Sequence, residues 1–256
     1  MRLLAVVCIP VLLLAACGDD DDGRGAPAAA MTLEGNITVF AAASLTDAFT
    51  ELGTELESEH DGVSVEFNFG ASSALREQIL AGAPADVFAS ANTSNMDQVV
   101  QAGAAADPEN FVTNQLQIVV PAGNPANITG LADFAKGDLL IGLCAEEVPC
   151  GQFGRQALTN AGVTPSIDTN EPDVRSLLTK VEAGELDAGI VYVTDVLAAG
   201  NDVEGIGIPA DQNVTATYPV AALSDTGNSE VADAFVAFVL SGKGQDILAS
   251  YGFGSP

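Results

Sequence analysis

The sequence contains few basic residues. Only 8 of its 256 residues are Lys or Arg, whereas 35 are Asp or Glu, so the formal net charge is -27 at pH 7. A surface this acidic repels nucleic acid and anionic lipid head groups, which excludes both as binding partners. It also repels a free anion at long range, so any anion site in this chain must depend on local dipoles.

Histidine is almost absent as well. The single histidine, His60, lies in a polar Glu-His-Asp-Gly segment far along the chain from Cys144 and Cys150, which disfavours a Cys/His metal site. A secreted serine or thiol enzyme using Ser44 or Cys150 remains an alternative, but its nucleophile would need a nearby base. His60 follows the far end of a predicted helix that begins at Ser44. We therefore expect no catalytic residue and no cofactor.

Long apolar runs are also missing. The run from Leu3 to Ala16 is shorter than the ~17 to 25 residues that span a bilayer, and with Arg2 before it this segment is typical of a secretory signal peptide. It ends in Leu14-Ala15-Ala16-Cys17, which resembles a bacterial lipobox and implies that Cys17 is acylated after cleavage. A plain signal peptide with Cys17 as a bystander is the alternative. We expect an extracytoplasmic protein, lipid-anchored to the outer face of the cell membrane or periplasmic.

Four cysteines are present, and two of them belong to the N-terminal segment. Cys8 leaves with the predicted signal peptide and Cys17 is the predicted lipidation site, so Cys144 and Cys150 remain. In an oxidising compartment two cysteines this close in sequence most simply form a disulfide. Closing so short a loop stabilises by roughly 2 kcal/mol, so its expected value is to hold one loop in shape.

The chain divides into four predicted parts. Residues 1–16 are the signal peptide, and residues 17–32, rich in Asp, Gly, Ala and Pro, are a flexible tether. The remaining chain is long enough for two lobes of roughly 100 residues each. A turn cluster from Pro121 to Pro125 suits a crossover between them. We expect lobe 1 to comprise residues 33–118 and 215–256 and lobe 2 to comprise residues 119–214.

From Ile37 onward, short β-rich runs alternate with helical stretches, which predicts an α/β fold with a mostly parallel sheet in each lobe. Strands are expected at residues 37–42, 63–69, 86–90, 115–120, 139–143, 188–193, 203–208 and 215–223. Helices are expected at residues 44–59, 72–81, 95–102, 131–135, 151–160, 174–183, 229–240 and 244–250. Ligands of such folds bind outside the carboxyl ends of strands, where helices begin, so a ligand cleft is expected between the lobes.

Two serines stand at such strand-to-helix junctions. Ser44 and Ser72 each follow a predicted strand and open a predicted helix. By itself Ser44 is well explained as a helix N-cap. Two serines at neighbouring helix starts favour a different interpretation, because hydroxyl groups and free backbone N–H groups together form a donor-rich anion pocket.

In order and spacing, the chain from Ile37 to Phe253 resembles the extracytoplasmic molybdate-binding proteins. The likeness rests on Ile37 to Thr46, Ser72-Ser73 with Leu75-Arg76, Gly82 to Phe88, Val148 to Gly151, Asp173 to Arg175, Gly189 to Tyr192, Tyr218 to Val220 and Tyr251 to Phe253. The resemblance implies a two-lobed, type II periplasmic-binding-protein-like fold and a monomer that delivers molybdate or tungstate to an ABC transporter permease. The chain has no Walker-type glycine loop, so the ATPase of such an importer is another chain.

The resemblance also implies the ligand contacts. Ser44 and Ser72 would donate hydroxyl and backbone N–H groups, Cys150 and Val174 backbone N–H groups, and Tyr192 its phenolic O–H. The family commonly has Ala where this chain has Cys150, which a backbone role tolerates. Tyr192 as a plain core aromatic is the competing interpretation. We interpret Arg175, beside Val174, as a surface helix residue.

A divalent tetrahedral oxyanion offers only hydrogen-bond acceptors, so five donor residues can satisfy it without a cation or a resident metal ion. Such a donor-only pocket disfavours phosphate, whose proton needs an acceptor, and it disfavours the smaller sulfate because its hydrogen bonds would stretch. A protein of the same fold for sulfate or phosphate remains the main alternative. Ferric iron is disfavoured, because no carboxylate, tyrosinate and His ligands are clustered at these junctions.

Overall fold

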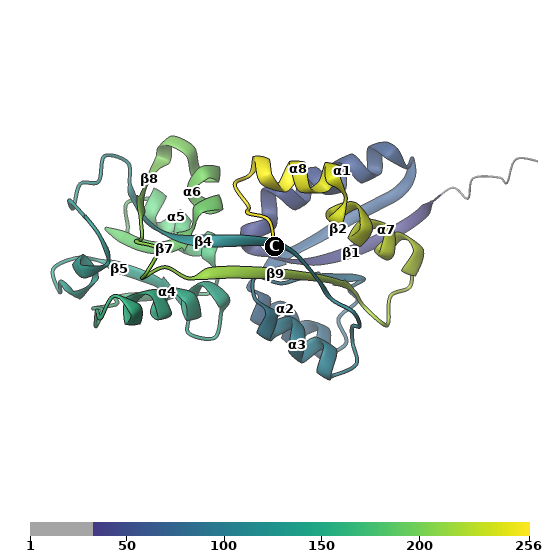
Figure 1. Ribbon diagram of the computed structural model, residues 1–256, viewed down its shortest axis with the longest axis horizontal. Coiled ribbons are helices and arrows are strands. Elements are labelled where there is room, and N and C mark those ends of the chain that lie inside the picture. The colour runs from purple at the N-terminus through teal and green to yellow at the C-terminus, as the bar shows by residue number, and fades with distance from the viewer. Residues whose placement is uncertain (1–32) are drawn as a thin grey trace, which may run out of the picture. The chain divides into compact units, whose positions relative to one another are not determined.

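The computed structural model describes residues 33–256, so the predicted signal peptide, Cys17 and the tether lie outside it. The described residues form a 9-stranded sheet with the order β2-β1-β3-β9-β4-β7-β5-β6, and β8 pairs with β4 at the side of this path. Helices flank the sheet, as Figure 1 shows. Within residues 33–256, no helix combines the length and the apolar character that crossing a bilayer requires.

The first half of the sheet consists of β1 (Glu34–Ala42), β2 (Gly62–Gly70) and β3 (Val87–Ala89), with β2 and β3 both parallel to β1. Five helices cover it. The helices α1 (Thr46–Glu59), α7 (Ser229–Leu240), α8 (Gly242–Ser250), α2 (Ser72–Leu80) and α3 (Thr93–Gln101) belong to this half. In Figure 1, α1, α7 and α8 lie on one side of the strands and α2 and α3 on the other.

Side-chain spacing explains this arrangement. Along α1, Phe49, Leu52 and Leu56 recur at the helical period and are buried, so the helix presents one apolar face to the sheet. On the opposite face of the sheet, Phe88 of β3 and Leu75 of α2 belong to a second buried cluster. The strands are therefore covered on both faces, as parallel strands require.

The second half of the sheet consists of β5 (Ile141–Cys144), β6 (Thr169–Glu171), β7 (Ala188–Tyr192) and β8 (Val203–Gly207). Strands β6 and β7 are parallel to β5. The helices of this half are η2 (Leu131–Ala135), α4 (Pro149–Asn160), α5 (Val174–Glu182), α6 (Val193–Ala199) and η3 (Gly200–Asp202). All residues of β7 are buried, because helices cover it as well.

Two strands connect the halves. In β4 (Glu109–Pro121), residues 109–115 pair with β9 (Thr215–Ala222), and residues 116–121 pair with β7 and β8. These pairings are antiparallel, and β9 is also antiparallel to β3. Figure 1 shows β4 and β9 side by side between the two groups of helices. The chain thus passes from one half to the other along β4 and returns along β9.

Most elements agree with the sequence prediction within a few residues, but five differ, one of them the 3-10 turn η3, which was not predicted. Strand β4 begins at Glu109 rather than at Gln115, because pairing with β9 outweighs the weak strand propensity of its polar first residues. The short strand β6 and the helix α6 were not predicted. The helix expected from Ser44 begins at Thr46, after a 3-10 turn, η1 (Ala43–Leu45).

Candidate functional site

A small pocket lies between the two halves of the sheet, at the point where several helices begin. It is lined by the ends of β1, β2 and β7 and by the first residues of η1, α2, α4 and α5. Its lining includes all five residues predicted from the sequence, namely Ser44, Ser72, Cys150, Val174 and Tyr192. The cavity volume is about 20 Å³, which exceeds the space for one buried water only slightly, so this arrangement accepts only a small ligand.

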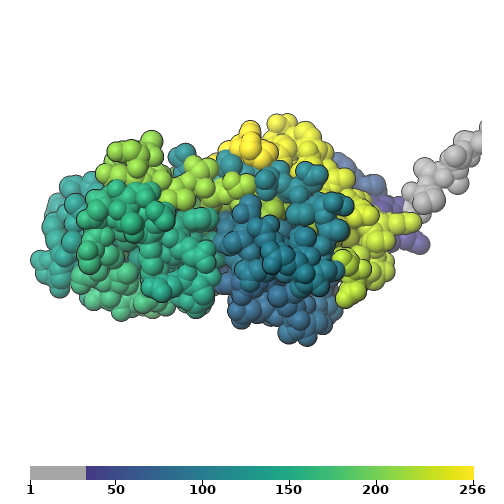
Figure 2. Space-filling view, turned by 60° about the horizontal axis from the view of Figure 1, so that its bottom comes forward, coloured from purple at the N-terminus to yellow at the C-terminus, as the bar shows by residue number. Residues whose placement is uncertain are grey.

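The two halves meet closely around this pocket. On the face that Figure 2 shows, the teal and green residues of the second half lie against the blue residues of the first half. A hydrogen bond of 3.2 Å from the Asn92 amide, at the start of α3, to Gln152 of α4 also joins the two halves. The pocket is therefore formed by elements of both halves.

The pocket lining is electrically neutral except for one carboxylate. It contains no Lys, Arg or His, and its one acidic residue is Asp173. The helices α2 and α4 carry no capping side chain, so the N–H groups of their first turns have no intrahelical or side-chain partner. Each helix N-terminus adds about half a positive charge, so several starts at one point create a positive potential without a cation.

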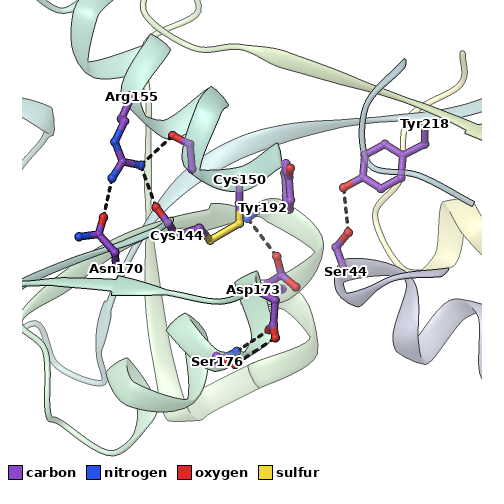
Figure 3. Close-up of a disulfide and its surroundings, with 11 residues drawn as sticks. Ser44, Cys144, Cys150, Arg155, Asn170, Asp173, Ser176, Tyr192 and Tyr218 are labelled. Atoms are coloured by element: carbon purple, nitrogen blue, oxygen red, sulfur yellow. Dashed lines mark hydrogen bonds between the residues drawn. A yellow bond between two sulfur atoms is a disulfide. The ribbon is translucent and has the colours of Figure 1, made fainter. Parts of the chain in front are cut away.

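Ser44 lies in η1 and is only 4% exposed. The N-cap interpretation is wrong, because α1 begins after Leu45 and receives no side-chain cap. Instead, the Ser44 hydroxyl lies 2.9 Å from the Tyr218 hydroxyl, a residue of β9. Figure 3 shows the two hydroxyl groups pointing toward each other.

Ser72 is the first residue of α2 and is 1% exposed. Its Oγ accepts a hydrogen bond of 2.9 Å from the backbone N–H of Ala91, another lining residue of the pocket. The proton of the Ser72 hydroxyl is therefore available to a ligand. Because β1, β2 and β3 are adjacent and parallel, their carboxyl ends bring Ser44, Ser72 and Ala91 to one edge of the sheet.

Three features of the structure restrain the backbone at the start of α4. The predicted disulfide between Cys144 and Cys150 is present and joins β5 to the first turn of α4 (Figure 3). Arg155 donates hydrogen bonds to the backbone carbonyls of Cys144 (2.7 Å) and Gly151 (3.1 Å). A Cβ atom on Gly151 would lie 1.8 Å from the Ala145 carbonyl oxygen, so only glycine permits this close approach. The backbone N–H of Cys150 is thereby fixed at the pocket.

Val174 is the first residue of α5, and the preceding Asp173 is its N-cap. One Asp173 oxygen accepts from the Ser176 backbone N–H (2.8 Å) and the other from the Ser176 hydroxyl (3.1 Å). Both oxygens of the one carboxylate in the pocket lining are therefore engaged by α5. This geometry leaves the Val174 N–H as a donor at the helix start.

Tyr192 ends β7 and is 1% exposed. Its hydroxyl is buried and has no hydrogen-bond partner among residues 33–256. Burial raises the pKa of the Tyr192 phenol well above its ordinary value, so the group is protonated and can donate. An unpartnered buried hydroxyl that lines a pocket indicates a missing acceptor, because such a group is costly to leave unsatisfied.

The interpretation of Arg175 as a surface helix residue needs correction. Its side chain is 28% exposed, and its guanidinium pairs with Asp47 of α1 at 2.5 Å and with Asp195 of α6 at 3.1 Å. Asp195 also accepts the Tyr192 backbone N–H at 3.1 Å. Sequence reasoning missed this link because Asp47 and Arg175 come together only in the tertiary structure.

Tyr218 was also missed as a site residue. It appears in the Tyr218-Pro219-Val220 motif of the family resemblance, but nothing in the sequence places its hydroxyl beside Ser44. The only available signal was a tyrosine in the buried run of the last strand. As for metals, residues 33–256 contain no group of three or more His, Cys, Asp or Glu side chains arranged to hold an ion.

Comparison with known proteins gives consistent matches. The bacterial extracellular solute-binding protein family matches residues 37–254. The molybdate-binding protein ModA of Mycobacterium tuberculosis is 40% identical over 244 residues, which are 95% of this chain and 93% of that protein. Among solved structures, the Azotobacter vinelandii periplasmic molybdate-binding protein matches with a TM-score of 0.75 at 20% identity, over 86% of this chain and 99% of that chain.

The sulfate-binding protein SubI from Mycobacterium tuberculosis has a similar structure, with a TM-score of 0.78 at 19% identity over 85% of this chain and 86% of that chain. Because the sequence identities are only 19% and 20%, the two structural matches are evidence for the fold alone. They confirm the predicted two-lobed α/β fold of periplasmic binding proteins.

Proposed function

Because the chain belongs to the family of bacterial extracellular solute-binding proteins, we propose that it captures molybdate or tungstate for an ABC transporter. Its 40% identity to a molybdate-binding protein over 95% of the chain supports this ligand over sulfate. The proposed ligand contacts are Ser44, Ser72, Cys150, Val174 and Tyr192. The ligand is bound as an intact oxyanion, so the protein needs no cofactor.

One observation carries the proposal, namely the convergence of donors on a small pocket without a basic residue. The lining supplies the hydroxyls of Ser44, Ser72 and Tyr192 together with backbone N–H groups at the starts of α2, α4 and α5. An ion that offers only acceptors satisfies these donors, and the orphaned Tyr192 hydroxyl gains its missing partner. These local donors attract an anion although the chain has a net charge of -27, which repels anions at long range.

The pocket supports selectivity by protonation and by size. Charged ligand oxygens match the hydroxyl and N–H donors of the lining, whereas the proton of a protonated oxyanion would have to compete with Ser176 for an oxygen of Asp173, the one carboxylate there. A smaller dianion leaves longer and weaker hydrogen bonds in a pocket held by helix starts. Among small tetrahedral oxyanions, both effects favour those that are fully ionised and larger than sulfate.

The structure gives neither Cys150 nor Ser44 the features of a catalytic nucleophile. Cys150 is in a disulfide, and Ser44 bonds to Tyr218, which is not a base of the kind that activates a nucleophile. His60 follows the last residue of α1, whereas Ser44 precedes its first residue. We propose that the protein binds and releases its ligand without a catalytic step.

We also propose that the mature chain is a monomer, held at the outer face of the cell membrane through acylated Cys17. The lipobox-like Leu14 to Cys17 supports this anchoring. Mass spectrometry of the N-terminal peptide would show the acyl chains on Cys17. A Cys17→Ala variant that stays in the membrane fraction would refute the anchor.

The function is tested by thermal shift and calorimetry on the full chain with molybdate, tungstate, sulfate and phosphate. A ligand of the folded state raises the unfolding temperature by mass action. Molybdate and tungstate should produce the largest shifts. The double variant Ser44→Ala/Ser72→Ala should lose at least a hundredfold in affinity, whereas Ser58→Ala/Ser250→Ala, which changes two helix serines away from the pocket, should bind normally. Binding unaffected by loss of Ser44 and Ser72 would refute the site.

A further inference from the structure

The two serine hydroxyls of the pocket share an arrangement that the ligand contacts do not explain. Each serine oxygen lies within hydrogen-bond distance of another protein group that can donate a proton to it. The Ala91 backbone N–H donates to Ser72 Oγ at 2.9 Å, and the Tyr218 hydroxyl lies 2.9 Å from Ser44 Oγ. A hydroxyl whose oxygen already accepts has its own proton left to give, so both serines are turned into donors toward the pocket.

The direction of the bond between Tyr218 and Ser44 follows from the surroundings of Tyr218. This tyrosine is fully buried among the rings of Phe111, Tyr192 and Phe253. Ser44 is the one group within hydrogen-bond distance of its hydroxyl, and the side chains of Asn114 and Tyr192 are its next polar neighbours. If Ser44 donated instead, the buried phenol proton would lose its acceptor at 2.9 Å and the ligand would lose a donor. The chain Tyr218 to Ser44 to ligand leaves neither group unsatisfied.

We propose that Tyr218 is a positioning residue that keeps Ser44 a donor and thereby makes the pocket reject oxyanions that carry a proton. This inference rests on the proposed function, since it assigns a selectivity determinant to the same site. Tyr218 acts through Ser44 and does not line the pocket itself. The group that donates to Ser72 is the backbone N–H of Ala91, which a side-chain substitution cannot remove. The Tyr218 hydroxyl, which donates to Ser44, can be removed in this way.

The remaining polar side chains of the lining fit the same scheme. Both Asp173 oxygens accept from Ser176. The Tyr192 hydroxyl has no other partner in residues 33–256, so it gives its proton to the ligand. Releasing the Ser44 oxygen would therefore introduce an acceptor that this side of the pocket lacks.

The test is Tyr218→Phe, which keeps the aromatic ring against its neighbours and removes only the hydroxyl. Affinities of the full-length chain for molybdate, sulfate and phosphate are measured by calorimetric competition near neutral pH, where phosphate carries a proton and sulfate does not. We expect molybdate and sulfate affinity to fall together, about five- to tenfold, because Ser44 loses its orientation. Phosphate should hold or gain affinity, so the ratio of molybdate to phosphate affinity should narrow at least fivefold while the ratio of molybdate to sulfate affinity stays constant.

Two further variants separate this role from a purely structural one. Tyr251→Phe removes another tyrosine hydroxyl, which donates to Glu51 at the surface, and should leave both ratios unchanged. In a Ser44→Ala background, Tyr218→Phe should have no further effect on the phosphate ratio, because its target is gone.

The outcomes distinguish the two proposals. If the unaltered chain does not bind molybdate, the proposed function is wrong. If it binds molybdate but Tyr218→Phe weakens all three anions in parallel, or leaves the phosphate ratio unchanged, Tyr218 has no role in rejecting protonated ligands. A phosphate ratio that narrows equally with and without Ser44 would also overturn the inference.

Discussion

Arg175 of α5 and Asp47 of α1 form an ion pair at 2.5 Å that joins helices from the two halves of the sheet. The same guanidinium lies 3.1 Å from Asp195, whose side chain is fully buried. The Asp47 side chain is 42% exposed. One arginine therefore neutralises a partly exposed carboxylate and a carboxylate in the interior, directly beside Val174, one of the proposed ligand contacts.

This difference predicts unequal costs for removing the partners. Asp47→Asn should lower the free energy of unfolding by at most about 1 kcal/mol, because exposed ion pairs contribute little. Arg175→Gln should cost about 3 kcal/mol or more, since it leaves the Asp195 charge buried without its partner. Urea denaturation measures both. Lys243→Gln, which breaks ion pairs with Glu55 and Glu59 at the surface, serves as the control and should have no clear effect. Equal costs for Asp47→Asn and Arg175→Gln would contradict this account.

Asp195 predicts a pH dependence of stability. Burial raises its pKa from 3.8 to about 6, although Arg175 and the Tyr192 N–H lower it. The folded state therefore binds this proton more tightly than the unfolded state does. The resulting stabilisation is complete below pH 4 and is lost as the pH rises to about 6. The loss is on the order of 3 kcal/mol, from about 1.4 kcal/mol per pKa unit.

The measurement compares the unaltered protein with Asp195→Asn by urea unfolding at several pH values from 4 to 7. Groups that titrate in both proteins cancel in the difference. The free energy of unfolding of the unaltered protein should fall relative to that of the variant as the pH rises to 6. Above that pH the difference between the two proteins should stay constant. A difference that does not change with pH would show that Asp195 has an ordinary pKa.

The two glycines of α4 should respond differently to alanine. In Gly151→Ala, the new Cβ would meet the Ala145 carbonyl oxygen at 1.8 Å, so the start of α4 must move. We expect a loss of about 1–3 kcal/mol in stability and at least a tenfold loss in molybdate affinity. In Gly154→Ala the nearest atom lies at 3.6 Å, an ordinary contact, and the helix gains up to about 1 kcal/mol. Unaltered binding by a folded Gly151→Ala protein would show that the start of α4 is not a ligand contact.

The disulfide should make a small contribution to stability and a measurable one to binding. Cys144→Ala/Cys150→Ala should lower the free energy of unfolding by about 2 kcal/mol, because the closed loop is short. The hydrogen bonds from Arg155 remain, so α4 should still form while the Cys150 N–H becomes less fixed. Molybdate affinity should fall less than tenfold. A reducing agent should reproduce these effects in the unaltered protein and change nothing in the double variant, and the idea fails if reduction leaves affinity unchanged.

The sequence by itself determined the order of most elements and the residues that we propose as ligand contacts. Alternating strand and helix periodicity located the junctions that follow β1 and β2, because hydrophobic spacing is a local property of the chain. The cysteine count and the expected compartment predicted the disulfide between Cys144 and Cys150, and the resemblance named five residues that the fold brings to one pocket.

Only the tertiary structure decided which groups stand behind those residues. Strand β4 extends over polar positions because it pairs with β9. The Arg175 side chain is partly buried because it forms ion pairs with Asp47 and Asp195. Tyr218 reaches Ser44 across 174 positions of sequence. Such contacts depend on how two halves of a sheet pack together, and the propensity of neighbouring residues carries no information about them.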